Sequence, residues 1–206
     1  MNLIGNNCGS AFYYKFAQIE FNNPFVWCLF TPQDMIYLIQ NYENIDFDEI
    51  DLAKLDENTF KTSNLVRQRM KEHRNIVGIN IDNKITPYYV HYLFDCRCET
   101  PVAHGIDVFY KRNYEYVYDK YISRLNRNGL DEQPTFLIIA YSFHGWTYEL
   151  LREVCNIKTD KKIIIITNYD IPHNSNVHII HDDLQNLDTE FVTKIHYNDI
   201  KSILGE

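Results

Sequence analysis

Two near-continuous apolar runs in the last third of the chain constrain the fold more than any other feature of the sequence. They read PTFLIIAYS at 134–142 and KKIIIITN at 161–168, and a third run, NVHIIHD, follows at 176–182. The segment TYELLREVCN lies between the first two and has the pattern of a helix, with Thr147 as its N-cap. Buried strands that alternate with helices indicate a parallel sheet covered on both faces.

The start of the chain adds a strand to this sheet. Residues 2–5 are apolar enough for a short strand, and a helix is expected to start near Ser10, a suitable N-cap. We therefore expect an α/β fold, a three-layer sandwich with a mainly parallel sheet of the Rossmann-like or SGNH-hydrolase-like kind. Residues 1–206 are read as a single domain, and residues 43–75, charged and weakly patterned, as an irregular insertion within it.

Local signals predict further elements in the middle of the chain. Thr31, Pro32 and Asp34 form an N-terminal helix signature before an apolar face at i, i+3 and i+4. Residues 79–81 and 85–90 alternate around Asp-Asn and predict a hairpin. A helix of more than twenty residues is expected from 107 onward, ended by Gly129.

Composition and charge narrow the class of protein. Of the 206 residues, 45% are hydrophobic, which suffices for a packed core. The net charge of −8, with 20 basic against 28 acidic residues, disfavours nucleic acid as a partner. Five cysteines, an odd number, favour reduced thiols over a disulfide scaffold. With no leader pattern and no apolar run of about 20 residues, we expect a cytoplasmic protein without a membrane span.

The first candidate for chemistry is the break after the opening strand. Sites in open parallel sheets lie at the carboxyl ends of strands, and Asn6, Asn7, Cys8, Gly9 and Ser10 come directly after this one. A thiol at a helix N-terminus is expected to have a lowered pKa, because the helix dipole and unpaired N–H groups stabilise the thiolate. Backbone N–H groups beside the glycine, with an asparagine amide, offer an oxyanion site. The alternative is a small buried thiol that only packs.

Other side chains are candidates to assist that thiol. His91 ends a β-rich run and Asp95 follows four residues later, so they suit a general base and its orienting group; the alternative is a half-buried histidine bonded to backbone. Ser142 and His144 follow the strongest strand, where they serve either a site or a loop and helix cap. Arg124 belongs to a basic helix face that either meets solvent or directs an anion-binding fork into the site.

The sequence indicates neither a cofactor nor a metal. It contains no P-loop and no G-x-G-x-x-G pattern. His173, His178 and His181 precede Asp182 and Asp183, but their spacing matches no familiar metal site. We therefore expect chemistry carried by side chains alone.

Several segments, in order, resemble two related bacterial families. They are IGNNCGSAFYY, NNPFVWCLFTPQDMIYLIQNYENIDF, YYVHYLFD, YEYVYDKYISRLNR, TFLIIAYS and KKIIIITN. One family occurs in exopolysaccharide and lipopolysaccharide gene clusters, and the chain is similar to it in the Asn-Asn-Cys, Asn-Pro-Phe-Val and His-Tyr motifs. The other is a family of papain-like cysteine peptidases, similar in the Asn-Cys-Gly opening, the Pro-Phe-x-Trp segment and the strand-end histidine. Val26 stands where that second family usually has Asp.

The resemblance implies roles for particular residues. Cys8 would be the nucleophile and His91 its base, with Asn7 and Gly9 shaping the oxyanion site. Asn23, Pro24, Phe25 and Trp27 would build a wall, and Tyr92 belongs to the His-Tyr motif. The expected function is surface-polysaccharide biosynthesis or modification, through cysteine-dependent acyl transfer or deacylation on a sugar. The partners would then be a sugar or polysaccharide precursor and an acyl donor.

Two alternatives stay open at this point. The same Cys8–His91 pair would serve a papain-like cysteine peptidase, which differs only in its substrate. A sugar-binding or glycosyltransferase-like module would instead use Phe25, Trp27 and Tyr92 to stack on sugar rings, although aromatic side chains more often pack in cores. The sequence does not indicate the oligomeric state.

Overall fold

The computed structural model describes residues 1–46, 51–55, 76–80, 88–89, 114–127, 129–185 and 188–206. The helices in these segments are α1 (Gly9–Ala17), α2 (Pro32–Asn41), α4 (Tyr114–Leu125), α5 (Tyr148–Cys155), α6 (Thr189–Ile195) and α7 (Tyr197–Leu204), with short 3₁₀ turns η1 (Tyr42–Asn44), η3 (Gly129–Asp131) and η4 (Ser142–His144). The strands are β1 (Asn2–Gly5), β2 (Cys28–Leu29), β3 (Asp51–Leu55), β4 (Ile76–Asn80), β5 (Tyr88–Tyr89), β6 (Pro134–Ile139), β7 (Lys162–Thr167) and β8 (Val177–His181).

A four-stranded parallel sheet, in the order β1-β6-β7-β8, forms the centre of the fold. Its pairing register runs from Asn2 opposite Pro134 to Gly5 opposite Leu137, and β6 and β7 continue in parallel on the far side. The prediction of a parallel α/β sheet that includes the opening strand is confirmed. The apolar runs are continuous because both faces of β6 and β7 are buried. An alternating pattern would place polar side chains in the core on one of these faces.

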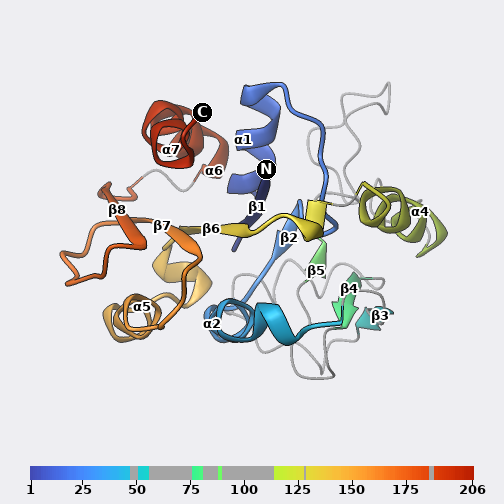
Figure 1. The fold of residues 1–206 in the computed structure, drawn as a ribbon, viewed down its shortest axis with the longest axis horizontal. Coiled ribbons are helices and arrows are strands. Elements are labelled where there is room, and N and C mark those ends of the chain that lie inside the picture. Colours follow the sequence, from blue (N-terminus) through green and yellow to red (C-terminus); the bar gives the residue numbers. More distant parts are fainter. Residues whose placement is uncertain (47–50, 56–75, 81–87, 90–113, 128, 186–187) are drawn as a thin grey trace.

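Helices lie on both sides of this sheet, as Figure 1 shows. On one side α1, α6 and α7 pack over the alternate strand residues Leu137, Ile139 and Ile164. On the other side α2 and α5 pack over Phe136 and Ile138 and their neighbours. The alternation of strand side chains between two faces therefore builds two hydrophobic clusters with one sheet between them.

A second sheet of four strands, in the order β2-β5-β4-β3, is antiparallel. The pairing of β4 with β5 agrees with the predicted hairpin partners, while the turn between them lies outside the described residues. Within the segment 43–75, which we expected to be an irregular insertion, β3 pairs along its whole length with β4, and the insertion itself stays a prediction. The sequence pattern did not reveal this strand because its partner begins about twenty residues later in the chain.

Helix boundaries follow the capping residues closely. Thr31 accepts the Asp34 N–H at 3.2 Å, and Thr147 accepts the Leu150 N–H at 3.4 Å, so both predicted N-caps are confirmed. The first helix differs: it begins at Gly9 with Cys8, not Ser10, in the N-cap position.

Gly129 does not end the long predicted helix. That helix, α4 in its described part, ends at Leu125, four residues earlier. Gly129 instead begins η3 and lies against the backbone of Asn22. Its N–H donates to the Asn22 carbonyl at 3.1 Å, and a Cβ at this position would clash with that carbonyl oxygen. The glycine thus permits a close backbone approach.

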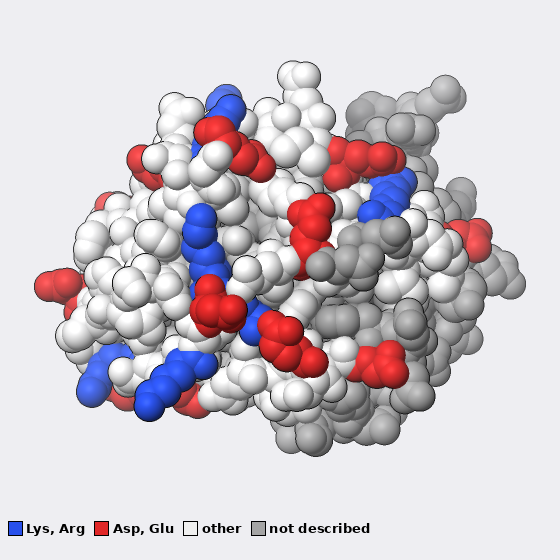
Figure 2. Space-filling view, in the orientation of Figure 1, with Lys and Arg blue, Asp and Glu red and all other residues white. Residues whose placement is uncertain are grey.

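The outer surface carries charges of both signs. On the face in Figure 2, basic and acidic side chains are interspersed, and its described part presents no continuous basic field. Among the helices that the structure describes, none is long and apolar enough to cross a membrane.

Candidate functional site

The connections after two neighbouring strands leave the parallel sheet on opposite sides. Strand β1 continues into α1 on one face, whereas the adjacent β6 continues through η4 into α5 on the other face. Such a point, where connections diverge at the carboxyl edge, opens a crevice and is where open α/β sheets bind their ligands. The Cys8 turn and the Ser142–His144 turn are the two segments that follow these strands.

Asn6 fixes the Cys8 turn to β6. Its side-chain Oδ1 accepts the Ile139 N–H at 2.9 Å and its Nδ2 donates to the Ile139 carbonyl at 3.2 Å. The amide thereby continues the backbone ladder beyond the end of β1. Asn7 adds a longer bond of 3.4 Å to the same carbonyl, and both asparagines are buried. Both are thus structural in this arrangement, holding the turn rather than facing solvent.

The expected oxyanion donor at Gly9 is already engaged. The Gly9 N–H donates to Asn7 Oδ1 at 3.0 Å, so a bound oxyanion would have to displace that oxygen. A Cβ at Gly9 would lie 2.8 Å from Ile139 Cδ1, which shows that the glycine serves helix-to-sheet packing. Ser10 is fully buried one residue later, and its hydroxyl makes no hydrogen bond within the described part of the chain.

Cys8 lies where the sequence predicted, between strand and helix, but its electrostatics differ from the expectation. The residue is only 8% exposed. Burial raises the pKa of its thiol well above the usual range, and a backbone hydrogen bond at Cys8 itself lowers it by less. The predicted lowering of this pKa is therefore wrong, because desolvation outweighs the helix N-terminus. Any nucleophilic role requires a base to remove the proton.

His144 is the described histidine on the neighbouring turn. It is half-buried, and burial lowers its pKa to about 4, so the imidazole is neutral at pH 7. The ring packs edge-on against Tyr141 with their centres 5.6 Å apart. Ser142 is exposed at the start of the same turn, which closes at Gly145 with φ of +88°. The turn thus carries a neutral imidazole and a hydroxyl just after the end of β6.

The predicted wall is mostly interior. Asn23 and Phe25 have no exposed surface and Pro24 is also buried. Asn23 Oδ1 accepts the Phe25 N–H at 3.0 Å, which holds this segment in a tight turn. Their side chains fill the core in this structure, and their role as a substrate wall stays a prediction.

Trp27 and Arg124 complete that region in different ways. Trp27 is partly exposed, has φ of +71°, and packs edge-on against Phe12 at 5.2 Å. A bulky residue in this backbone region is strained and is held there by its packing. Arg124 is buried, donates to the Val26 carbonyl at 3.0 Å and lies over the Phe21 ring at 4.9 Å. Arg124 thus anchors the segment before β2.

His91, Tyr92 and Asp95 lie outside the described residues. Their predicted roles as base, sugar-stacking ring and orienting group accordingly stay predictions.

A histidine that sequence reasoning did not select lies at the far end of the same sheet edge. His196 Nε2 is 2.7 Å from Asp182 Oδ2, and its Nδ1 is 3.3 Å from Asp199 Oδ2. The interaction joins the end of β8 to the α6–α7 junction. Both ring nitrogens face carboxylates, so this histidine links structural elements. Only the His196–Asp199 spacing of three residues was visible in the sequence.

Comparisons with known proteins give no match for this chain, either among protein-family models or among curated proteins.

Proposed function

We propose that this chain is a cysteine-dependent acyl-transfer enzyme that acts on a sugar in surface-polysaccharide biosynthesis or modification, with Cys8 as the nucleophile. We also propose that its parallel sheet and covering helices form a Rossmann-like or SGNH-hydrolase-like sandwich. The main support for the acyl-transfer proposal is the position of Cys8, which follows β1 beside the point where the connections of β1 and β6 diverge. The resemblance of the segments around Cys8 to the polysaccharide family supports the substrate class.

The reaction requires that the Cys8 proton move before or during attack. A base takes the proton, and the sulfur then forms a bond to the carbonyl carbon of an ester. When the tetrahedral intermediate collapses, the carbon–oxygen bond breaks and the alcohol leaves with the proton from the base. A sugar hydroxyl then attacks the thioester and regenerates the thiol; when water attacks instead, the result is deacylation.

Two histidines are candidates for the base. His144 is neutral and follows the neighbouring strand, but its low pKa makes it a weak proton acceptor at pH 7. His91 is the partner that the family resemblance implies. The asparagines provide a rigid frame, because Asn6 and Asn7 hold the turn that carries Cys8 against Ile139.

Turnover of p-nitrophenyl acetate, with and without a hexose acceptor, tests the proposal. We expect Cys8→Ser to lose at least about a hundredfold in rate, as removal of a nucleophile does. Cys155→Ser, which changes another buried thiol, should keep the rate. Acetylated hexose among the products supports transfer. Hydrolysis of casein instead, with no ester turnover, would support the peptidase alternative and overturn the sugar assignment.

A further inference from the structure

The helices on the other face of the parallel sheet border an open surface groove with a volume of about 460 Å³. Its lining comes from the end of α2 and from one side of α5 and the residues just after it, namely Gln40, Glu149, Arg152, Glu153, Asn156 and Ile157. This volume lies within the usual range for small-molecule sites, about 300–1,000 Å³. The groove is separated from the Cys8 turn by the sheet.

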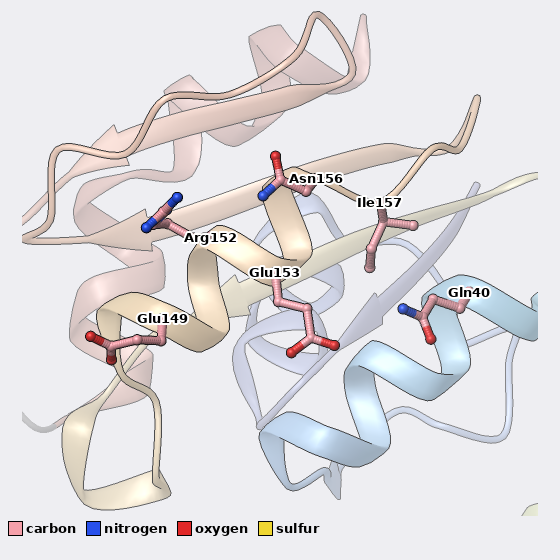
Figure 3. Close-up of a pocket in the computed structure, with 6 residues that line it drawn as sticks. All are labelled: Gln40, Glu149, Arg152, Glu153, Asn156 and Ile157. Atoms are coloured by element: carbon pink, nitrogen blue, oxygen red, sulfur yellow. The ribbon is translucent and has the colours of Figure 1, made fainter.

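Two polar side chains face each other across this groove. Figure 3 shows Glu153 extending from α5 toward α2, and the Gln40 amide extending back from α2. Ile157, which is only 8% exposed, projects between them and forms part of the floor of the groove. Within the described segments, neither the Glu153 carboxylate nor the Gln40 amide has an ion pair or a side-chain hydrogen bond. Both groups are therefore available to a ligand.

The one cation in the lining is directed elsewhere. The Arg152 guanidinium lies over the Tyr148 ring at 5.8 Å, and its charge also acts on Glu149. The pKa of Glu149 is lowered mainly by hydrogen bonds from its own backbone N–H and from Thr147. The opposite charges of Arg152 and Glu149 thus offset each other, which leaves the negative charge of Glu153 in the groove.

We propose that this groove binds a small hydroxylated amine of amino-sugar size. An ammonium group supplies the cation that Glu153 lacks, through a charge-assisted hydrogen bond. The Gln40 amide both donates and accepts, which matches a hydroxyl group that does the same. A neutral sugar would satisfy only the second of these interactions.

Titration of the ¹⁵N-labelled full chain with glucosamine, followed by amide chemical shifts, tests this site. We expect the largest shifts at Gln40, Glu153, Asn156 and Ile157. Glu153→Gln should weaken glucosamine binding roughly tenfold, as expected for loss of a hydrogen bond to a charged group. Gln40→Ala should weaken it less. Glu190→Gln removes the same charge from α6 on the opposite side of the sheet and should leave binding unchanged.

Two further ligands separate the contributions. Glucose and N-acetylglucosamine lack the ammonium group and should bind wild type about as weakly as glucosamine binds Glu153→Gln. Equal binding of all three sugars by wild type would overturn the role of Glu153. Shifts confined to other surfaces, or no saturable shifts with glucosamine, would overturn the site itself.

This site is independent of the proposed acyl transfer. Cys8→Ser should bind glucosamine as wild type does, because the sheet lies between the two regions. A wild-type chain that binds glucosamine but does not turn over the ester would overturn acyl transfer alone. A wild-type chain that turns over the ester but does not bind glucosamine would overturn the groove site alone.

Discussion

The Cys8 turn and the α2–α5 groove differ in how their polar groups are used. At the turn, Asn6 and Asn7 are buried and bonded to β6 or to the turn itself. In the groove, Glu153 and Gln40 face open space without protein partners in the described structure. The first arrangement fixes the turn that carries Cys8, whereas the second leaves hydrogen-bonding capacity for an exchangeable ligand.

The same difference predicts how each region responds to substitution. A buried, satisfied amide cannot be removed without leaving its partners unsatisfied, so changes at the turn should lower stability. Exposed groups are hydrated when no ligand is present, so changes in the groove should alter binding and little else. Four substitutions sharpen this contrast, from the largest expected effect on stability to the smallest.

Asn6→Ala should have the largest effect. It leaves the Ile139 N–H buried without a partner and weakens the bonding of its carbonyl, which costs about 2–4 kcal/mol of unfolding free energy. Urea unfolding measures the loss. Asn41→Ala, which removes an amide bonded within its own helix, should cost less than about 1 kcal/mol. Equal losses for the two variants would show that Asn6 does not anchor the turn.

His144 should make the protein less stable in acid. Its folded pKa of about 4 lies below the ordinary histidine value of 6.5, so the unfolded chain binds the proton more readily. Stability is thus unaffected above pH 6.5 and falls as the pH drops toward 4, by up to about 3 kcal/mol. His144→Gln should remove this component from a pH series of unfolding curves, whereas His173→Gln, at an exposed position, should keep it. An unchanged pH dependence in His144→Gln would contradict the burial of this imidazole.

Gly9→Ala should destabilise the protein by about 1–2 kcal/mol, because the new methyl meets Ile139 Cδ1 at 2.8 Å. Helix propensity alone predicts the opposite sign, since alanine is the better helix former. Thermal unfolding of the variant therefore distinguishes the two effects, and a raised Tm would mean that α1 does not pack this closely on the sheet.

Glu153→Gln should have the smallest effect on stability, within about 0.5 kcal/mol of wild type. Glu190→Gln gives the matched comparison, because it loses one exposed pair with Lys15. A large loss for Glu153→Gln in urea unfolding would show that the carboxylate supports the fold, and the contrast between the two regions would not hold.

Local signals in the sequence predicted the architecture well. The capping pattern of Thr31, Pro32 and Asp34 needs only neighbouring residues, and the apolar runs of β6 and β7 show directly that both faces are covered. The position of Cys8 between strand and helix followed from the same local information.

Properties set by distant residues were not predictable in this way. The pKa of Cys8 depends on how tightly other elements cover the thiol, and burial reversed the effect expected from the helix N-terminus. The Asp182–His196 contact and the approach of Gln40 to Glu153 join residues from different elements. The family resemblance implied that Phe25 contacts the substrate, whereas its side chain packs in the core. The sequence alone does not show which aromatic rings other elements cover.

Trapping of an acyl-enzyme offers the decisive measurement of nucleophilic chemistry at Cys8. The chain is mixed with p-nitrophenyl acetate, quenched in acid, digested and examined by mass spectrometry. We expect a thioester-linked acetyl group on the peptide that contains Cys8, formed at the rate of nitrophenol release and absent from Cys8→Ser. Acetylation confined to other residues, with ester turnover unchanged in Cys8→Ser, would show that Cys8 is a buried structural thiol.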